Sequence, residues 1–393
     1  MSEAYIVSAL RTAGGRRGGQ LSGWHPVDLG AQILNALVAR TGCDPALVED
    51  VIMGCVFQGG EQSNNVARNA VLASDLPEAV PACTVDRQCG SSQQALHFAA
   101  QAVMSGTMDV VIAAGVESMT RVPMFSPSSV AQKAGMGFYF SPGLGARYPQ
   151  VQEWSQFVGA ELVARKYGLT RDDLIEFAFR SHRLAVKATN AGKFAEEIVP
   201  IAQMRADGST TGERHTIDEG IRFDASLEGI AGVRPITEDG LCSAATSSQL
   251  CDGASGVLVV SERGLKTLGV EPLARVHHMS VLGCDPVVML EGPVPATKAA
   301  LTKTGLKIDE IDLFEINEAF APVPLAWLQA TGADPDRLNV HGGAIALGHP
   351  LGASGTKLSA TLIHALRDRN ARYGLLSMCE GGGMANVTIF ERM

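Results

Sequence analysis

Aromatic residues, cysteine pairs and long apolar runs are scarce in this sequence of 393 residues. Aromatics make up only 5% of it, which favours a large α/β protein over a β-sandwich or a coiled coil. None of its 8 cysteines stands in a C-x-x-C pair or in a Cys/His spacing typical of zinc sites. Neither a disulfide framework nor a metal site is indicated, and a reducing compartment fits best.

Membrane and nucleic-acid partners also lack a signal. No apolar run reaches the length of a membrane span, and the first residues lack a basic segment followed by an apolar one. Clusters of Lys and Arg are missing, and the formal net charge is −9 at pH 7. We therefore expect a cytoplasmic protein without membrane or nucleic-acid partners, in which any anionic ligand meets basic residues placed locally.

What the sequence does have is glycine, 43 residues of it, in a chain that is 46% hydrophobic. Its length indicates two or three domains. Apolar runs typical of strands alternate with helical patterns, and this alternation predicts a largely parallel sheet. The expected strands are 5–9, 48–56 and 109–115, and the expected helices between them are 26–41 and 62–73.

The pattern of the first part recurs in the last part. Residues 312–317 read as a strand, 340–366 as a strand, a Gly-rich turn and a helix, and 372–378 as a buried strand. We interpret the chain as two similar α/β halves, packed so that equivalent turns face a common site. The predicted boundaries are 1–120, completed by part of 240–270, for the first half and 271–393 for the second.

A loop-rich insertion, 121–240, separates the two halves. Residues 121–153 are rich in Pro, Gly, Ser and aromatics without a clear period, so we expect a long functional loop there. Helical patterns follow at 156–167 and 171–190, the second with Thr170 as its N-cap.

Cys89 lies where a strand-like run changes into a helical one, in V-D-R-Q-C-G-S-S-Q-Q-A. A cysteine at a helix N-terminus gains thiolate character from unpaired N–H groups and the helix dipole. A lone cysteine is more often a buried structural residue. Its role therefore depends on the other motifs.

Three C-terminal motifs carry further candidates. His349, in G-G-A-I-A-L-G-H-P-L-G-A-S-G, precedes a proline and is enclosed by glycines, so we expect it on an extended, closely approachable backbone. Cys379 ends a strand in C-E-G-G-G, whose N–H groups could either bind an oxyanion or simply form a tight turn. Asn317, in E-I-N-E-A-F-A, could orient a water or cap a helix.

A thioester condensation needs this combination of groups. One nucleophile holds an acyl group, a base removes a proton next to a second thioester carbonyl, and two pockets stabilise the successive oxyanions. Two cysteines, a histidine and glycine turns could supply all of them.

Taken together, these motifs resemble the thiolase family, the acetyl-CoA acyltransferases, over essentially the whole chain. The resemblance implies a layered αβαβα fold of two halves. It also implies reversible thiolytic cleavage of 3-ketoacyl-CoA to acetyl-CoA and a shortened acyl-CoA, or the reverse Claisen condensation. Coenzyme A would be a substrate or product, with no permanently bound cofactor, and the protein would be a homodimer or homotetramer.

The resemblance also implies residue roles. Cys89 would be the acyl-accepting nucleophile, His349 the group that activates it, and Cys379 the acid/base at the α-carbon. Asn317 would hold, with the catalytic histidine, a water that forms one oxyanion hole.

The second oxyanion hole would consist of the N–H groups of the nucleophile and Gly381. For coenzyme A, the resemblance places Arg222 near the nucleotide and Ser248 near the pantetheine.

This chain departs from the family pattern at three places. Asp86 stands where Asn is frequent, C-G-S-S replaces C-G-S-G, and Q-F-V-G-A-E at 156–161 replaces M-G-x-x-A-E. With E-Q-S-N-N at 61–65, the chain is similar to degradative bacterial thiolases that handle bulky or steroid-derived acyl chains. Two alternatives remain: a ketoacyl synthase, against which the second cysteine argues, and a non-catalytic acyl-CoA or lipid-binding relative, against which the full catalytic set argues.

Overall fold

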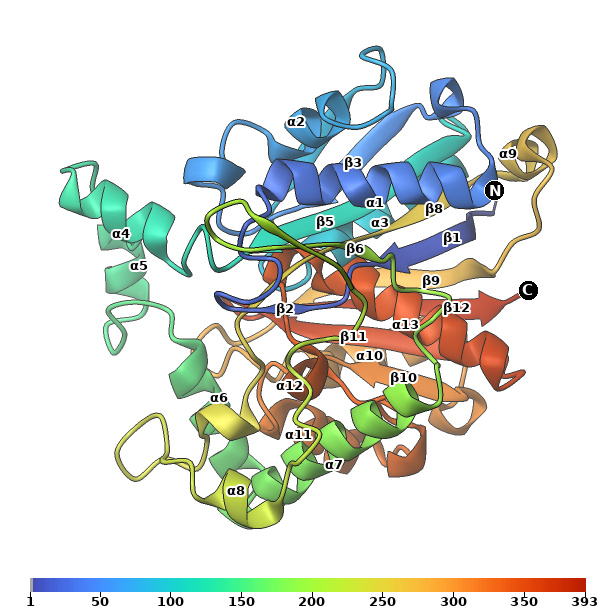
Figure 1. Cartoon of the computed structure of the whole chain (residues 1–393). Coiled ribbons are helices and arrows are strands. Elements are labelled where there is room, and N and C mark those ends of the chain that lie inside the picture. Colours follow the sequence, from blue (N-terminus) through green and yellow to red (C-terminus); the bar gives the residue numbers. More distant parts are fainter. Residues whose placement is uncertain (1–2) are drawn as a thin grey trace.

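The computed structural model describes residues 3–393, in which the two halves are built on one mixed sheet (Figure 1). The first half contains the strands β1 (Tyr5–Arg11), β2 (Gly15–Arg16), β3 (Asp50–Gly54), β4 (Ala82–Val85), β5 (Val110–Ser118) and β8 (Cys251–Val260) and the helices α1 (Pro26–Thr41), α2 (Val66–Leu72) and α3 (Ser91–Met104). After α9 (Glu262–Leu268), the second half contains the strands β9 (Ala274–Gly283), β10 (Leu313–Ile316), β11 (Tyr373–Glu380) and β12 (Met384–Arg392) and the helices α10 (Pro293–Thr304), α11 (Pro322–Thr331), α12 (Ala344–Leu347) and α13 (Ser354–Asp368).

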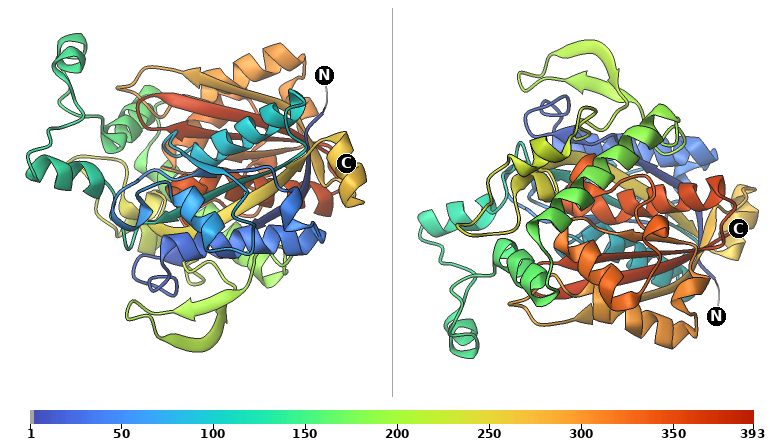
Figure 2. Two further views of the ribbon diagram at one scale, coloured as in Figure 1. Left: turned by 90° about the horizontal axis from the view of Figure 1, so that it is seen from above. Right: turned by 90° about the horizontal axis from the view of Figure 1, so that it is seen from below.

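The segment between β5 and β8 is not a structureless loop. It forms the helices and strands α4 (Ser126–Lys133), α5 (Pro142–Arg147), α6 (Gln156–Lys166), α7 (Arg171–Asn190), β6 (Ile201–Met204), β7 (Thr210–His215) and α8 (Leu227–Ala231). Residues 121–153, called the arm below, were expected to be a loop and instead carry α4 and α5. The arm and the β6–β7 hairpin project from the body of the molecule (Figure 2).

The prediction of a largely parallel sheet is wrong. The strand order is β10-β11-β12-β9-β1-β8-β5-β3-β4, and of the strand pairs within residues 3–393 only β10/β11, β3/β5 and β3/β4 are parallel. The central strands pair antiparallel. β8 returns to the sheet after the long segment that follows β5, whereas β12 follows β11 directly through the glycine turn 381–383 and then pairs with β9. Short apolar runs do not encode strand direction, which depends on how the chain returns.

Five layers follow from the way alternate strand residues face different helices. On β5, Val111 and Ala113 join the core around α3 and α13, while Ile112 and Ala114 join the core under α1 and α2. In the second half, the other faces of β10 to β12 pack under α10 and α11. Because successive strand side chains point to opposite faces, α3 and α13 form a middle layer between the two halves.

Two local expectations also need correction. The helix predicted at 62–73 begins only at Val66, because Asn64 and Asn65 adopt left-handed backbone conformations and the Asn65 side chain caps the helix. The strand predicted at the start of 340–366 is absent from the described structure. A single parallel bridge, Phe314 to Leu338, stands where the first half has the pair β3/β4.

Among residues 3–393, no helix is both long and apolar enough to span a bilayer.

Candidate active site

Cys89 lies in the tight turn between β4 and α3, as predicted. The preceding residue, Gln88, has a left-handed φ of 49°, and α3 begins two residues after Cys89, at Ser91. The Ser91 hydroxyl holds the turn closed by accepting from the Arg87 N–H at 2.9 Å and donating to the Gln88 carbonyl at 2.6 Å. A turn fixed at both ends presents the sulfur in one direction.

The expected thiolate stabilisation at this helix end is not what dominates. Burial, reinforced by the nearby Glu380 carboxyl, raises the pKa of the Cys89 thiol to about 12. The backbone N–H groups of Cys89 and Gly381 oppose this shift, because both donate toward the sulfur. The resting group is therefore a neutral thiol, and its activation requires a base.

His349 provides a neutral imidazole at the same cavity. Its Nδ1 lies 2.5 Å from the Ser354 hydroxyl, which itself donates to the Pro350 carbonyl at 2.9 Å. Ser354 must therefore accept from an Nδ1–H, which makes Nε2 the acceptor nitrogen of the ring. Burial and the neighbouring Lys357 lower the pKa of His349 to about 3, so the ring is uncharged at neutral pH.

The backbone before His349 is held by a buried cation that the sequence did not single out. The Lys357 ammonium donates to the carbonyls of Leu347 at 2.5 Å and Gly348 at 3.0 Å. Gly348 has φ 81°, a conformation that suits glycine. Both Ser354 and Lys357 lie on α13 directly after the G-H-P-L-G motif, and their proximity in sequence was the signal available.

Asn317 lies beside the same imidazole. Its side-chain N–H donates to His349 Nε2 at 3.2 Å. Its buried Oδ1 has no hydrogen-bond partner among the described residues. An amide in this position can hold a small polar group next to the histidine.

Cys379 is fully buried at the end of β11, where a strand was predicted. Burial raises the pKa of its thiol well above the usual value, and the adjacent Cys89 raises it further. Next to it, the buried Glu380 carboxyl lies directly over the Gly90 Cα, where an added Cβ would come within 1.9 Å of Oε1. This carboxyl between the two cysteine turns was not anticipated.

One cavity connects the nucleophile and the histidine to the surface. Cys89 and His349 both line it, its volume is about 580 Å³, and its other walls include Met119, Phe320 and Leu351. A mostly apolar cleft with a few convergent polar groups is the usual form of a small-molecule site.

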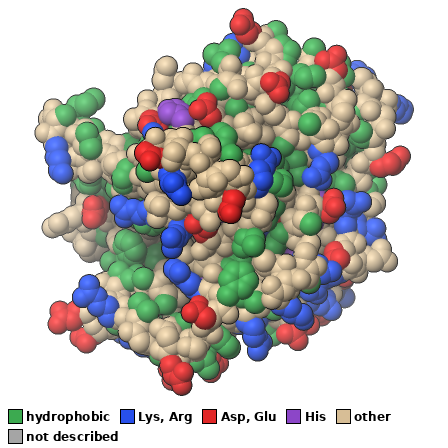
Figure 3. Space-filling model, in the orientation of Figure 1, with side chains coloured by type: hydrophobic (Ala, Val, Ile, Leu, Met, Phe, Trp, Pro, Cys, Tyr) green, Lys and Arg blue, Asp and Glu red, His purple; other side chains and the backbone are tan. Residues whose placement is uncertain are grey.

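The two residues expected to contact coenzyme A also lie at this opening. Ser248 lines the catalytic cavity, and Arg222 lines both this cavity and a neighbouring one of about 400 Å³. Arg16 and Arg17, which the sequence analysis did not single out, line the catalytic cavity too. Figure 3 shows Lys and Arg side chains gathered near apolar surface on this face of an otherwise mixed-charge molecule.

Within residues 3–393, no three His, Cys, Asp or Glu side chains are grouped as metal ligands would be. A neutral buried cysteine beside a neutral imidazole, with a second buried cysteine behind it and arginines at the entrance, is an arrangement suited to acyl transfer from an anionic thioester.

Comparisons with known proteins agree with this class. Residues 4–263 match the family model of the thiolase N-terminal domain, and residues 270–392 match that of the thiolase C-terminal domain. The chain belongs to the thiolase family and is an acyltransferase.

Several relatives are similar over their full length. A protein of Mycobacterium tuberculosis named "Steroid 3-ketoacyl-CoA thiolase FadA6" is 51% identical, covering 100% of this chain and 95% of the relative. A 3-ketoacyl-CoA thiolase of Yersinia pestis is 42% identical, with 100% of both chains covered. The crystal structure of the Bacillus anthracis acetyl-CoA acetyltransferase superposes with a TM-score of 0.91 at 34% identity, covering 100% of this chain and 99% of that one.

Proposed function

We propose that this thiolase cleaves 3-ketoacyl-CoA with bulky, steroid-derived acyl chains in a degradative direction. The observation that carries the proposal is the shared cavity of Cys89 and His349, with Cys379 buried directly behind the nucleophile. The name of the M. tuberculosis relative supports the steroid-derived class of chain.

In the proposed first half-reaction, His349 Nε2 gives up the hydrogen bond from the Asn317 amide and takes the proton of the Cys89 thiol as the sulfur attacks the 3-keto carbon. The oxyanion that forms is held by the N–H groups of Cys89 and Gly381, which converge on this sulfur. The bond between C2 and C3 then breaks. The shortened acyl group stays on Cys89, and the acetyl-CoA carbanion takes a proton from Cys379.

Asn317 supports the second oxyanion site. In the resting site its amide N–H donates to His349, and its Oδ1, which has no partner among the described residues, can hold a water beside the imidazole. That water and the histidine would stabilise the acetyl-CoA enolate oxygen.

In the second half-reaction, coenzyme A loses its thiol proton to Cys379 and attacks the acyl group on Cys89. The acyl-CoA product leaves, and protonated His349 returns its proton to the Cys89 sulfur, so that both cysteines and the histidine are again in their starting protonation states. Arg222, with Arg16 and Arg17 at the entrance, would bind the anionic nucleotide of coenzyme A, and Ser248 the pantetheine.

We further propose that the protein works in the cytoplasm as a homodimer or homotetramer. The eight unpaired cysteines support a reducing compartment.

The test is a thiolysis assay with coenzyme A and 3-ketoacyl-CoA substrates of rising bulk, from acetoacetyl-CoA to chains that bear fused rings. We expect kcat/KM to be maintained or to rise with bulk. Cleavage of acetoacetyl-CoA far faster than of every larger substrate would contradict the bulky-chain assignment, and no cleavage of any of them would contradict the reaction.

A further inference from the structure

Aromatic residues are scarce in the chain but concentrated in one short segment. Of its 13 Phe, 5 Tyr and 3 Trp residues, seven lie within residues 125–157, in and just after the arm. Five of them, from Phe138 to Trp154, form a chain of ring contacts in which Phe140 and Tyr148 pack edge to face against Trp154 at 5.3 and 5.2 Å. Such packing gives this otherwise irregular segment a defined shape.

Several of these aromatic side chains are nevertheless exposed. The side chains of Phe125, Phe138 and Tyr139 are 48%, 37% and 48% exposed. Exposed aromatic surface that gathers in one place marks a contact with another molecule.

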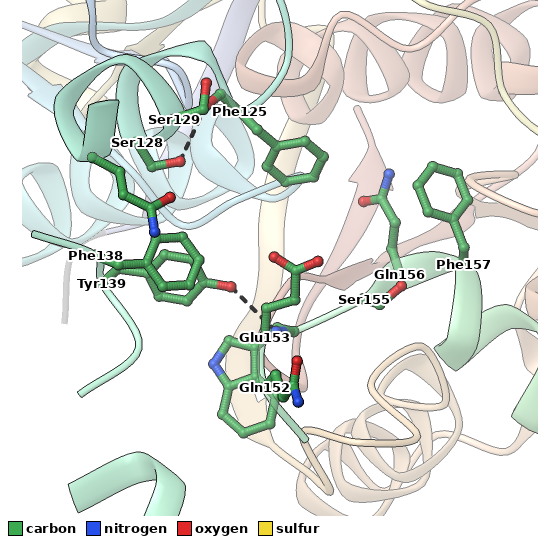
Figure 4. Close-up of a pocket in the computed structure, with 12 residues that line it drawn as sticks. Phe125, Ser128, Ser129, Phe138, Tyr139, Gln152, Glu153, Ser155, Gln156 and Phe157 are labelled. Carbon is green, nitrogen blue, oxygen red and sulfur yellow. Dashed lines mark hydrogen bonds between the residues drawn. The ribbon is translucent and has the colours of Figure 1, made fainter. Parts of the chain in front are cut away.

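These side chains line one cavity of about 590 Å³ between the arm and the start of α6 (Figure 4). In the close-up, Phe125, Phe138 and Tyr139 lie on one side of an open space, and Gln156 and Phe157 lie on the other. The volume falls in the range of sites that hold ligands of drug or cofactor size.

This aromatic cavity meets the catalytic cavity at α6. Gln156 and Phe157 line both cavities. Phe157 stacks edge to face on Phe320 at 5.8 Å, and the Gln156 amide contacts the Met124 sulfur at 3.8 Å. These two residues belong to the Q-F-V-G-A-E segment, where the chain departs from the family pattern, so the departure falls at the junction of the two spaces.

We infer that the aromatic cavity is a subsite for the ring-bearing end of the acyl chain, and that Gln156 and Phe157 at its junction with the catalytic cavity determine specificity. This inference rests on the proposed function, because it assumes that the reacting carbon lies at Cys89.

The rest of the lining identifies the class of ligand. Beside the aromatic faces stand hydroxyl and amide side chains, among them Ser128, Ser129, Gln132 and Gln152, and one carboxyl group, that of Glu153. The aromatic faces suit a flat, apolar fused-ring system, and the polar groups can bond a hydroxyl or keto oxygen on its distal edge. The ligand is thus an oxygen-substituted polycyclic acyl group carried on coenzyme A.

The test compares two variants with the wild type on two substrates. Phe138→Ala removes one aromatic wall, and Ser128→Trp fills the cavity. The substrates are acetoacetyl-CoA, which is too short to leave the catalytic cavity, and a 3-ketoacyl-CoA that ends in a hydroxylated fused-ring system. Met136→Ala is the matched control, because Met136 lies in the same arm, is 80% exposed and does not line the cavity.

For both cavity variants we expect kcat/KM on the ring-bearing substrate to fall roughly 10- to 100-fold, mainly through KM, while acetoacetyl-CoA cleavage changes less than about twofold. Met136→Ala should match the wild type on both substrates. Preserved acetoacetyl-CoA cleavage shows at the same time that each variant is folded.

Two outcomes would overturn the inference. Equal losses on both substrates, or none, would show that the cavity does not hold the ring. A change of mass in light scattering, without a change in selectivity, would show that the arm is a contact between subunits. If the wild type cleaves ring-bearing chains and the variants keep their selectivity, only the subsite fails, whereas a wild type inactive on every 3-ketoacyl-CoA removes the proposed function itself.

Discussion

At the scale of single residues, burial determines the protonation states of the site more than the helix dipole does. Cys89 stands at the start of α3 as the sequence predicted, yet burial raises the pKa of its thiol. Burial also lowers the pKa of His349, so the two groups meet as a neutral acid and a neutral base. Proton transfer between them can then accompany bond formation instead of preceding it.

The first prediction concerns pH. A group whose pKa is lowered to about 3 is already deprotonated above that value, so His349 should stay a base throughout the range from pH 5 to pH 8. We expect kcat/KM for the 3-ketoacyl-CoA substrate to show no loss near pH 6.5 from histidine protonation. The measurement is a pH-rate profile of the wild type, with enzyme stability checked at each pH. A fall in kcat/KM on the acidic side with a midpoint near pH 6.5 would contradict the prediction.

The second prediction concerns the contact between Gly90 and Glu380. A methyl group on Gly90 would meet the Glu380 carboxyl at 1.9 Å, in a region without free space. Gly90→Ala should therefore lower the free energy of unfolding by about 1–3 kcal/mol and displace the nucleophile turn, with a matching loss of thiolysis. Adding Glu380→Gly should restore part of both, since it removes the colliding atoms.

Gly145→Ala is the control for this cycle, because no atom lies within 4 Å of its added Cβ. It should change neither unfolding nor activity appreciably. Equal effects of Gly90→Ala with and without Glu380→Gly would show that the two residues do not interact.

At the scale of secondary-structure elements, the sequence predicted best where a cap or a period marks the boundary. The helices 26–41 and 171–190 have the predicted bounds. α1 begins with a proline and ends before Gly42 in the left-handed conformation, and α7 has the Thr170 cap. These capping signals depend on only a few neighbouring residues, so they can be recognised from the sequence alone.

The errors arise where distant contacts decide. β8 enters the centre of the sheet after a long segment and runs antiparallel to both β1 and β5, and the arm is helical although its pattern is aperiodic. Two asparagines in left-handed conformations shortened α2. Each of these depends on tertiary context that single-sequence patterns do not contain.

The same division holds for the site. The motifs located Cys89, His349 and Cys379 because each stands at a turn between regular elements. The sequence analysis did not single out Ser354 and Lys357, which fix the histidine from α13, although they stand close to its motif, and the contact of Glu380 with Gly90 is visible only in three dimensions. Partners that act through packing leave no composition signal.

The third prediction tests the cap of α7. The Thr170 hydroxyl accepts from the Asp173 N–H at 3.2 Å, and the Asp173 carboxylate accepts from the Thr170 N–H at 2.7 Å. Thr170→Ala should lower the free energy of unfolding by about 1 kcal/mol, whereas Thr170→Ser should retain most of the stabilisation that the cap provides. Urea denaturation measures both, and an unchanged Thr170→Ala midpoint would contradict the role of the cap.

At the scale of the whole molecule, the sheet formed by residues 3–393 is open, with β10 at one edge and β4 at the other. β4 carries the exposed Cys83, and Asn65, from the segment 61–65, bonds to this strand at the Ala82 carbonyl and the Thr84 hydroxyl. Unpaired edge strands are normally covered, and the family resemblance implied an oligomer. Our fourth prediction is therefore that two subunits pack together at the β4 edge.

Light scattering at micromolar concentration should give at least twice the chain mass of 41.3 kDa. Cys83 should react slowly with a thiol reagent in the oligomer and quickly after dissociation. A monomeric mass under these conditions, together with a Cys83 that reacts quickly, would contradict the predicted packing of two subunits at β4.

The central claim is that the two buried cysteines perform different steps, and the most direct test is the mass of the intact protein after incubation with acetyl-CoA. Cys89→Ala should show no acetyl increment. Cys379→Ala should still gain an acetyl group, on Cys89, while losing thiolysis and proton exchange at the acetyl methyl by a factor on the order of 10² to 10⁴, the contribution of a positioned acid/base. Acetylation that persists in Cys89→Ala and vanishes in Cys379→Ala would contradict the account, because nucleophile and base would then be reversed.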